Sequence, residues 1–317
     1  MKKTFQGIEC GDLDDFFGQK MTAEKAIFAA AIYRDTPYKL VIGAGYSCCE
    51  YKKRINIFSF GKAKFALPFT VIAPPASIDR VGYFGELEAL ISDYSSQKGL
   101  FLILNDRQNQ SGLVACAHTL STAVFTNKFS NYEEYKTNLR SHYRRRLVLA
   151  EKKGAMLQWK QVPSQEFDQE LYQLYLQVLN HSDFPLETLG LDFFRACPAE
   201  IFALYDTRQK PVAFIMTTHF EEQTTFVFGG MDYDRRDEYD LYYNMMIQVL
   251  RTGFTNRSQK IDFGQTAENT KCRLGCALEP RYMLFFTRNP LLMFLSKKLI
   301  HLIEYHPGNE TYHVFKE

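Results

Sequence analysis

Residues 201–231, IFALYDTRQKPVAFIMTTHFEEQTTFVFGGM, contain three runs rich in β-branched and aromatic residues, at 201–205, 212–220 and 225–231. The two segments between these runs carry the polar sequences RQKP (208–211) and EEQ (221–223), which are typical of short turns. Consecutive strands with short turns pair antiparallel. The stretch therefore predicts a three-stranded antiparallel meander.

The elements on both sides of this meander predict helices packed on a mixed sheet. Before it we expect helices at 131–154, 167–179 and 189–196 and a strand at 156–162. After it we expect helices at 239–250, 267–274 and 291–303 and strands at 260–263 and 282–287. This order indicates a mixed α/β (α+β) fold with mostly antiparallel sheets, not a doubly wound parallel sheet.

The first half of the chain also alternates strand-like and helix-like patterns. We expect strands at 39–46, 55–72, 100–104 and 113–118 and helices at 22–33 and 86–94. A chain of 317 residues is long enough for two domains. We place these domains at 1–130 and 131–317, with the 131–154 helix as the join.

Composition excludes several classes of protein. The hydrophobic fraction of 46% excludes global disorder, and a net charge of +2 is small for a general nucleic-acid binder. Seven cysteines, with no signal peptide before them, are typical of buried thiols in a reducing compartment. No apolar run reaches the roughly 18–20 residues that cross a bilayer. We therefore expect a soluble, cytoplasmic protein.

Three further stretches carry a family resemblance through their order along the chain. They are 132–154, with YEEY leading to RRR and KKG; 204–232, with PVAF leading to FGGMD; and 241–275, with LYY leading to IDFGQTA and KCRLG. Together they resemble GNAT acyltransferases of the FemAB-like branch, a peptidoglycan biosynthesis and recognition type. The match covers roughly residues 131–287.

This resemblance implies tandem GNAT-like domains and an N-acyltransferase activity. The donor would be acyl-CoA or aminoacyl-tRNA, with no metal, and the acceptor an amine on a small molecule or cell-wall-type precursor. At 232–238 (DYDRRDE) the sequence departs from acyl-CoA-using GNAT enzymes, which carry a glycine-containing diphosphate loop there. FemAB-like members also lack the standard loop, and some use aminoacyl-tRNA.

Donor-binding candidates follow the meander. Gly229 and Gly230 suit a bulge where backbone approaches a ligand, and an ordinary bulge or turn carries equal weight. Arg235 and Arg236 precede a helix N-terminus and could hold a phosphate. Because four acidic residues share their segment, a solvated turn is the stronger interpretation.

A second group of donor-binding candidates forms the strongest local signal. Gly264 and Gln265 form a glycine turn before a short helix, and Lys271 lies about one turn into that helix. The lysine could contact a donor phosphate or carboxylate as a point charge, and the glutamine could orient a substrate by amide hydrogen bonds. A surface lysine is the ordinary alternative.

Catalytic candidates are His219, Asp232 and Tyr242, with Tyr243 beside them. An imidazole, carboxylate or phenol near the cleft could relay the proton of the attacking amine. For each residue taken singly, a structural role is favoured. No proton acceptor is needed if the amine arrives neutral.

Two alternatives come from other classes of protein. A degenerate GNAT fold could serve recognition without catalysis. Lys136, Arg140 and Arg144, at helical spacing in the basic segment 136–146, could bind tRNA or another RNA, although a solvated helix face is more common. The apolar 291–303 helix could lie on a membrane surface, and docking against the first domain is the favoured interpretation.

Overall fold

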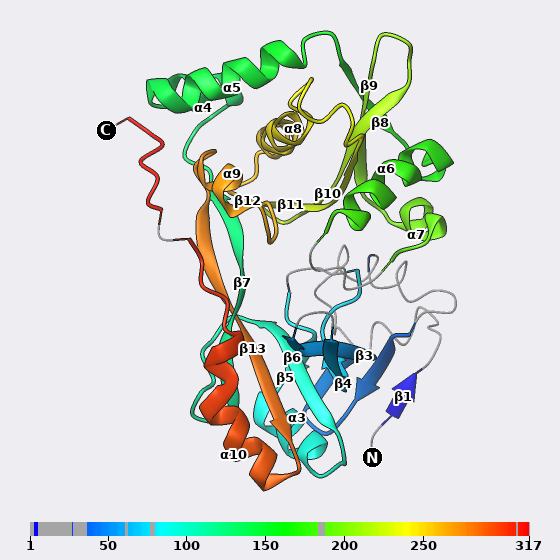
Figure 1. Cartoon of the computed structure of the whole chain (residues 1–317). Helices are drawn as coiled ribbons and strands as arrows, with labels where there is room; N and C mark the ends of the chain where they lie inside the picture. Colours follow the sequence, from blue (N-terminus) through cyan, green and yellow to red (C-terminus); the bar gives the residue numbers. More distant parts are fainter. Residues whose placement is uncertain are drawn as a thin grey trace. The chain divides into compact units, whose positions relative to one another are not determined.

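The chain forms two compact units, described here from a computed structural model (Figure 1). The described residues are 3–5, 27, 37–60, 63–76, 80–182, 188–308 and 310–316. The first unit comprises Met1–Ser121 and Pro280–Pro307, and the second comprises Thr122–Glu279 and Gly308–Glu317. Except for Ile27, the helix predicted at 22–33 lies outside the described residues.

The first unit takes a strand from late in the sequence. β13 (Ala277–Thr287) pairs antiparallel with β6 (Leu100–Asp106), from Tyr282 opposite Asp106 to Thr287 opposite Leu100. The predicted division at 130/131 therefore differs from the observed units, which assign 280–307 to the first. The pattern of β13 predicts a strand, and which sheet edge it joins is decided by tertiary packing.

The sheet of the first unit is mostly antiparallel, with one parallel pair between β4 and β6. Its strand order is β1 (Lys3–Phe5), β2 (Lys39–Ile42), β3 (Tyr46–Phe60), β4 (Ala63–Ile72), β6 and β13, with β5 (Tyr83–Gly85) beside β3. Helix α3 (Leu87–Ser95) buries Leu90 and Tyr94 in a core that these strands share.

The predicted meander forms the centre of the second unit. β9 (Glu200–Tyr205), β10 (Pro211–Phe220) and β11 (Gln223–Met231) pair antiparallel, with β8 (Gln158–Val162) antiparallel on β9. β12 (Lys260–Asp262) then lies parallel to β11 and antiparallel to the end of β7 (Ala115–Thr126). The predicted mixed α/β fold class is confirmed.

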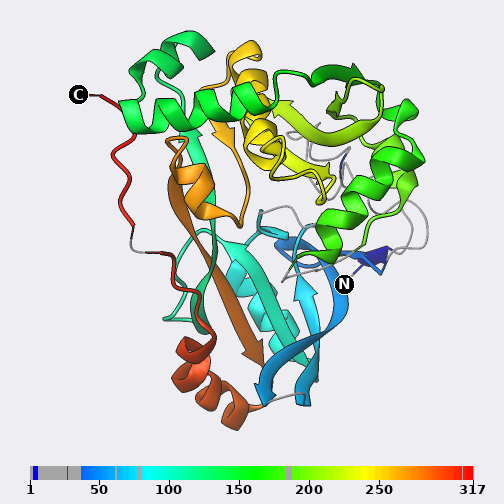
Figure 2. The same cartoon turned by 45° about the horizontal axis from the view of Figure 1, so that its top comes forward.

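Helices cover both faces of this meander. α6 (Gln169–Asn180) and α7 (Leu191–Ala196) lie on one face and α8 (Leu241–Thr255) on the other (Figure 1). α5 (Ser141–Lys153) lies beside α8 (Figure 2). α8 is buried along most of its length because it packs between α5 and the sheet, as expected of a helix that is apolar nearly all round.

The single helix predicted over 131–154 is wrong. α4 (Tyr132–Asn138) ends before Leu139 and Arg140, which are extended, and α5 begins at Ser141. Leu139 bridges Phe315, and the Arg140 N–H donates to the Val314 carbonyl at 2.9 Å. Pairing with the distant C-terminal segment thus interrupts the helix, so the three basic residues of the predicted stripe do not share one helix.

Gly229 and Gly230 let the helices approach β11 from opposite faces. A Cβ on Gly229 would lie 2.4 Å from Met245 Cε of α8, and one on Gly230 would lie 2.6 Å from main-chain atoms of Leu174 and Tyr175 in α6. Real Cβ atoms do not approach backbone this closely. Gly230 therefore has a packing role against α6, whereas Gly229 faces the flexible end of the Met245 side chain, in a strand paired with β10.

We predict that Gly230→Ala lowers the free energy of unfolding by about 1–3 kcal/mol, because α6 must move to admit a methyl group. Gly190→Ala is the control, since its Cβ would meet nothing within 4 Å. Losing a glycine N-cap costs at most about 1 kcal/mol. Urea unfolding followed by the fluorescence of Trp159, the single tryptophan, measures both in the second unit. Equal costs would contradict the packing role.

Candidate functional site

Two parallel strands of the second unit part after three residue pairs. β11 pairs with β12 only from Gln223 opposite Lys260 to Thr225 opposite Asp262. Beyond Asp262 the chain follows β7 instead: Phe263 N–H donates to the Ala123 carbonyl at 2.9 Å, and Ala123 N–H donates to the Gly264 carbonyl at 3.1 Å. Within the described ranges, no strand pairs with β11 on this edge over residues 226–231.

A β-bulge lies where the two strands part. Met216 is opposite Phe228 and Thr217 is opposite Phe226, so Val227 is an extra residue in β11. A bulge bends its strand and increases its twist. β11 thus carries main-chain groups along an edge that its neighbour has left. The bulge predicted at Gly229–Gly230 lies two residues earlier.

The loop after β12 is held in an uncommon backbone conformation. The backbone φ angles of Gly264, Thr266 and Ala267 are +70°, +65° and +48°, in a region that residues other than glycine rarely adopt. Lys271 of α9 (Glu268–Cys272) is only 2% exposed, and its ammonium donates to the carbonyls of Gly264 at 3.1 Å and Gln265 at 2.7 Å. The lysine therefore fixes the loop from inside.

This loop lies against β11 at the parting. A Cβ on Gly264 would lie 3.9 Å from the Phe226 carbonyl oxygen. The Asp262 carboxylate accepts the Gly264 N–H at 2.8 Å, so the loop is held from both of its ends. The predicted group Gly264, Gln265 and Lys271 is thus brought together.

Tyr242 of α8 lies within electrostatic range of Cys276, which in turn lies within electrostatic range of Lys271 and Asp262. Burial, followed by the nearby Cys276 thiol and Tyr233, raises the pKa of Tyr242 far above its ordinary value. Burial also raises the pKa of Cys276, which lies within electrostatic range of Lys271 and Asp262. At neutral pH Tyr242 is therefore a phenol that can donate a proton, and a base role is disfavoured.

The two candidate arginines have carboxylate partners. Arg235 Nη1 lies 2.7 Å from Asp206 Oδ2, and Arg236 Nε lies 2.9 Å from Asp237 Oδ1. The Arg235–Asp206 pair is largely buried, so this guanidinium is committed within the protein. The Arg236–Asp237 pair is exposed and would compete only weakly with the phosphate contact considered from the sequence.

The N-terminus of α8 is occupied by another pair. Asp240, with a left-handed φ of +54°, accepts from Arg146 Nη1 at 2.5 Å and Nη2 at 2.8 Å. Arg146 also lies 4.0 Å from the centroid of the Tyr243 ring. An anion at this helix end would compete with a bound carboxylate.

His219 and Asp232 lie at opposite ends of β11. The exposed His219 ring lies 3.3 Å from Thr224 Oγ1 and 3.2 Å from Ser258 Oγ, at the end where β11 and β12 are paired. Asp232 follows β11 and accepts the Asp234 N–H in a turn. Eight residues of strand separate the two ends by about 27 Å. The structure does not bring these candidates together.

Asp262 is a candidate that sequence reasoning missed. It is buried in the last pair between β12 and β11, and it accepts from Gly264 N–H and from Gln223 Nε2 at 3.4 Å. The available signal was an acidic residue ending an apolar strand immediately before Phe263 and Gly264. Its burial depends on the neighbouring strands, which that signal does not specify.

No protein-family model matches the sequence, and no curated protein matches it. Solved structures do match. L-PGS from Bacillus licheniformis is 13% identical over 93% of this chain and 98% of that chain, with a TM-score of 0.57. A C-terminal domain from Agrobacterium fabrum, named as a lysylphosphatidylglycerol synthetase, is 10% identical over 92% and 95%, with a TM-score of 0.53. FemX is 10% identical over 93% of this chain and 100% of that chain, with a TM-score of 0.50.

The chain has the fold of FemX. The FemAB-like resemblance predicted from the order of sequence motifs is confirmed at the level of fold. At identities of 10–13% these FemX-like structures show the shared architecture, and the chemistry of this chain is argued from its own residues.

We predict that Lys271→Ala lowers the free energy of unfolding by about 3 kcal/mol, because two loop carbonyls lose a charged donor. The simple surface role considered from the sequence would leave folding unaffected. Lys260→Ala, at an exposed lysine of β12, should change stability by less than about 0.5 kcal/mol. Urea unfolding followed by Trp159 fluorescence measures both, and similar small effects would contradict the loop-fixing role.

We predict that Asp206→Asn destabilises the fold at pH 7 by about 1–2 kcal/mol. The Arg235 hydrogen bond, then main-chain N–H groups, hold the pKa of Asp206 below its ordinary value. A carboxylate whose pKa is depressed by folding stabilises the fold at any pH above its unfolded-state pKa. This stabilisation is lost as the pH falls through the folded-state pKa. The difference should therefore shrink below about pH 4.

Asp237→Asn is the control for this prediction, because Asp237 is 84% exposed while Asp206 is 8% exposed. We expect no measurable change from the control. Thermal unfolding at several pH values measures both variants, and a pH-independent loss in Asp206→Asn would refute the ionic role.

Proposed function

We propose that the chain is an N-acyltransferase that moves an aminoacyl or acyl group directly from an activated donor to an amine. The supporting observation is the parting of β11 from β12 beside the Val227 bulge. Main-chain N–H groups on the unpaired edge of β11 can hydrogen-bond the donor carbonyl. Such preorganised donors stabilise the oxyanion that develops in acyl transfer.

For the donor we propose an ester of the aminoacyl-tRNA type in preference to acyl-CoA. A CoA diphosphate would need cations or open main-chain donors at the N-terminus of α8, where Asp240 is already paired with Arg146. Arg235 is also paired with the buried carboxylate of Asp206. The fold shared with FemX and with the protein named as a lysylphosphatidylglycerol synthetase is compatible with this donor.

The proposed chemistry assigns Tyr242 as a proton donor. A neutral amine attacks the ester carbonyl carbon, the C–O bond breaks, and the departing oxygen takes a proton from the Tyr242 hydroxyl. The attacking nitrogen loses a proton to solvent, and solvent restores the phenol. At neutral pH the Tyr242 phenol carries the proton that the departing oxygen needs.

Lys271 and Asp262 act as positioning residues in this proposal. They fix the loop of Gly264 and Gln265 beside β11, so Gln265 can orient the donor or acceptor by its amide. For the acceptor we propose an amine on a small molecule or a cell-wall-type precursor, following the FemAB-like resemblance.

The direct test is transfer of radiolabelled amino acids from a mixture of aminoacyl-tRNAs to a panel of amines, with acyl-CoA as the competing donor. We predict that Tyr242→Phe lowers kcat by about 100-fold or more while KM changes little. Tyr243→Phe is the matched control. The Tyr243 hydroxyl is buried with no hydrogen-bond partner in the described structure, so its removal should leave kcat and stability unchanged or raise stability.

Equal kcat in the two tyrosine variants would remove Tyr242 from the chemistry. Efficient transfer from acyl-CoA would refute the proposed ester donor and would still support acyltransferase activity. No transfer from any donor would favour the non-catalytic recognition alternative. The RNA-associated alternative required Lys136, Arg140 and Arg144 as one helical stripe, but Arg140 lies between α4 and α5 and Lys136 pairs with Glu151 at 2.6 Å. In this proposal the tRNA donor therefore binds without that stripe.

A further inference from the structure

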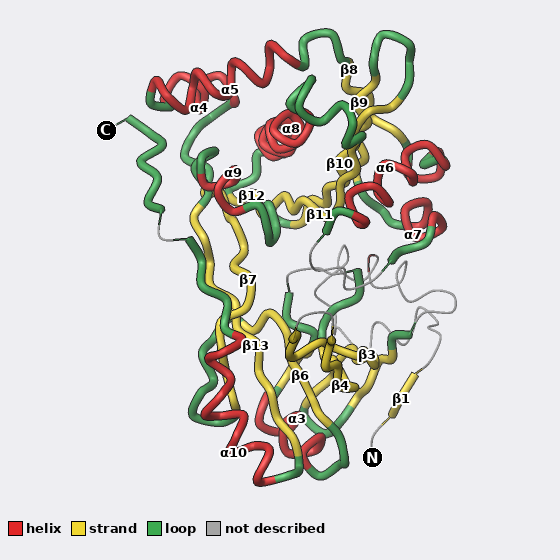
Figure 3. The backbone as a smooth tube through the Cα atoms, viewed as in Figure 1, coloured by secondary structure: helices red, strands yellow, loops and turns green. Residues whose placement is uncertain are grey.

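The first unit ends in a helix whose outward side is apolar. α10 (Pro290–Leu299) follows β13 and continues into the short 3₁₀ helix η3 (Ile300–Ile303) (Figure 3). The exposed large apolar side chains of this segment are Leu291, Leu292, Phe294, Leu295, Leu299, Leu302 and Ile303. The segment therefore exposes seven large apolar side chains over 13 positions.

Packing within the first unit uses a different side of this segment. Met293 and Ile300 contact a small cluster around Ala115 and Ala117 of β7. At 100° per residue, Met293 and Ile300 lie within about 20° of each other on the helix, whereas Leu291, Leu295 and Leu299 follow the opposite side. The docking expected from the sequence thus accounts for Met293 and Ile300 and leaves the outward side uncovered.

The charge of this segment has one sign. Residues 288–303 contain Arg288, Lys297 and Lys298 and no acidic residue. The Lys298 ammonium lies 4.6 Å from the centroid of the Phe294 ring, so a cation lies directly beside the apolar surface. Cations thus lie beside exposed apolar side chains, an arrangement that suits an interface between hydrocarbon and anionic headgroups.

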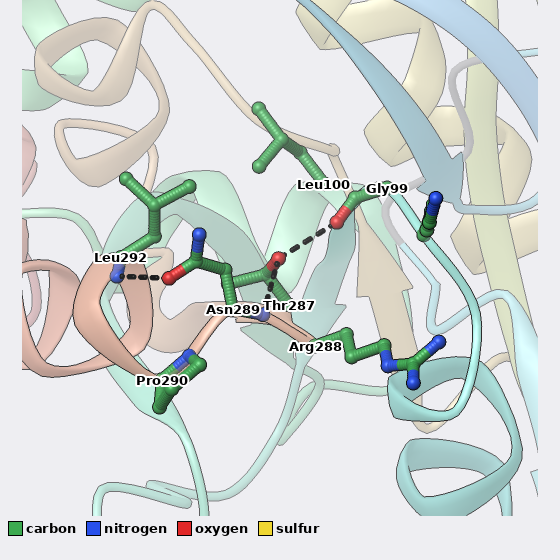
Figure 4. A pocket seen from close by; sticks show the side chains of 8 residues that line it. Gly99, Leu100, Thr287, Arg288, Asn289, Pro290 and Leu292 are labelled. Carbon is green, nitrogen blue, oxygen red and sulfur yellow. Dashed lines mark hydrogen bonds between the residues drawn. The ribbon is translucent and has the colours of Figure 1, made fainter.

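A pocket of about 460 Å³ lies at the start of α10 and adds another cation. It is lined by Lys98 and Arg288, with Leu292 of the apolar surface at its side (Figure 4). The Asn289 side chain accepts the N–H groups of Leu291 and Leu292, so the helix start is already capped. The pocket therefore offers side-chain cations beside the exposed leucines.

We propose that α10 and η3 bind the surface of an anionic phospholipid bilayer, with the apolar side chains among the acyl chains and the cations at headgroup phosphates. In this proposal the segment lies in the interface plane, as amphipathic surface helices do. Among the described residues no helix has the length and apolarity needed to span a bilayer. A protein–protein contact is disfavoured because interface cores are depleted in lysine, and Lys297 and Lys298 lie within this segment. This inference does not depend on the transferase proposal.

The test is co-sedimentation of the full chain with phosphatidylcholine vesicles that contain or lack phosphatidylglycerol. We expect binding to the anionic vesicles, weakened by salt as the headgroup attraction is screened. Leu302→Glu should lower the partition coefficient about tenfold or more, since a charge replaces an inserted apolar group beside anionic headgroups. Met156→Glu is the matched control, because Met156 and Leu302 are both 70% exposed and Met156 lies in the second unit. It should bind as the parent does.

Three results would overturn the inference: no binding to either vesicle, equal loss in Met156→Glu and Leu302→Glu, or equal binding to neutral and anionic vesicles. A dimer in sedimentation equilibrium that Leu302→Glu dissociates, together with no vesicle binding by the parent chain, would also overturn the inference. It would indicate that the apolar side chains contact a second copy of the chain. Circular dichroism of each variant separates loss of binding from loss of fold.

Discussion

The candidate site depends on how β12 divides its hydrogen bonds between two neighbours. One edge of this three-residue strand pairs with β11, and the other pairs with β7. After Asp262 the chain keeps only its bonds to β7, through Ala123, while the Val227 bulge twists β11. The strands therefore part, and the later residues of β11 keep main-chain groups along an edge that no described strand pairs with.

The polar groups around this opening are largely committed to holding it in shape. Lys271 and Asp262 satisfy main-chain groups of the loop, and their burial makes these contacts costly to lose. At the start of α8, Asp240 is bound by Arg146 in the same way. Under the proposed function, a reactant in this region meets main-chain donors and the Tyr242 phenol, while the Lys271 ammonium and the Arg146 guanidinium are already held by protein groups.

Secondary structure in the second unit follows closely from its sequence pattern, because polar turn residues separate runs with a strand or helix period. The meander, the fold class and the fold-level family resemblance were predictable. The break at Leu139 and Arg140 was not, because the apolar spacing of four continues through it and the extended conformation comes from the C-terminal segment. Within the candidate site, the sequence identified Gly264, Gln265 and Lys271 as a group of neighbouring residues. Their role in fixing the loop depends on the burial of Lys271, which the sequence does not show.

The sequence by itself determined which segments form strands and helices, since hydrophobic period and turn residues act over a few neighbours. It also placed Gly229 and Gly230 at the end of the meander, and their contacts with α6 and α8 are known only from the fold. Tertiary structure alone decided which strands pair, that β13 joins the first unit, and that His219 and Asp232 lie at opposite ends of β11. These properties arise from contacts between residues far apart in the chain, and no local pattern records which distant residue occupies a given edge or face.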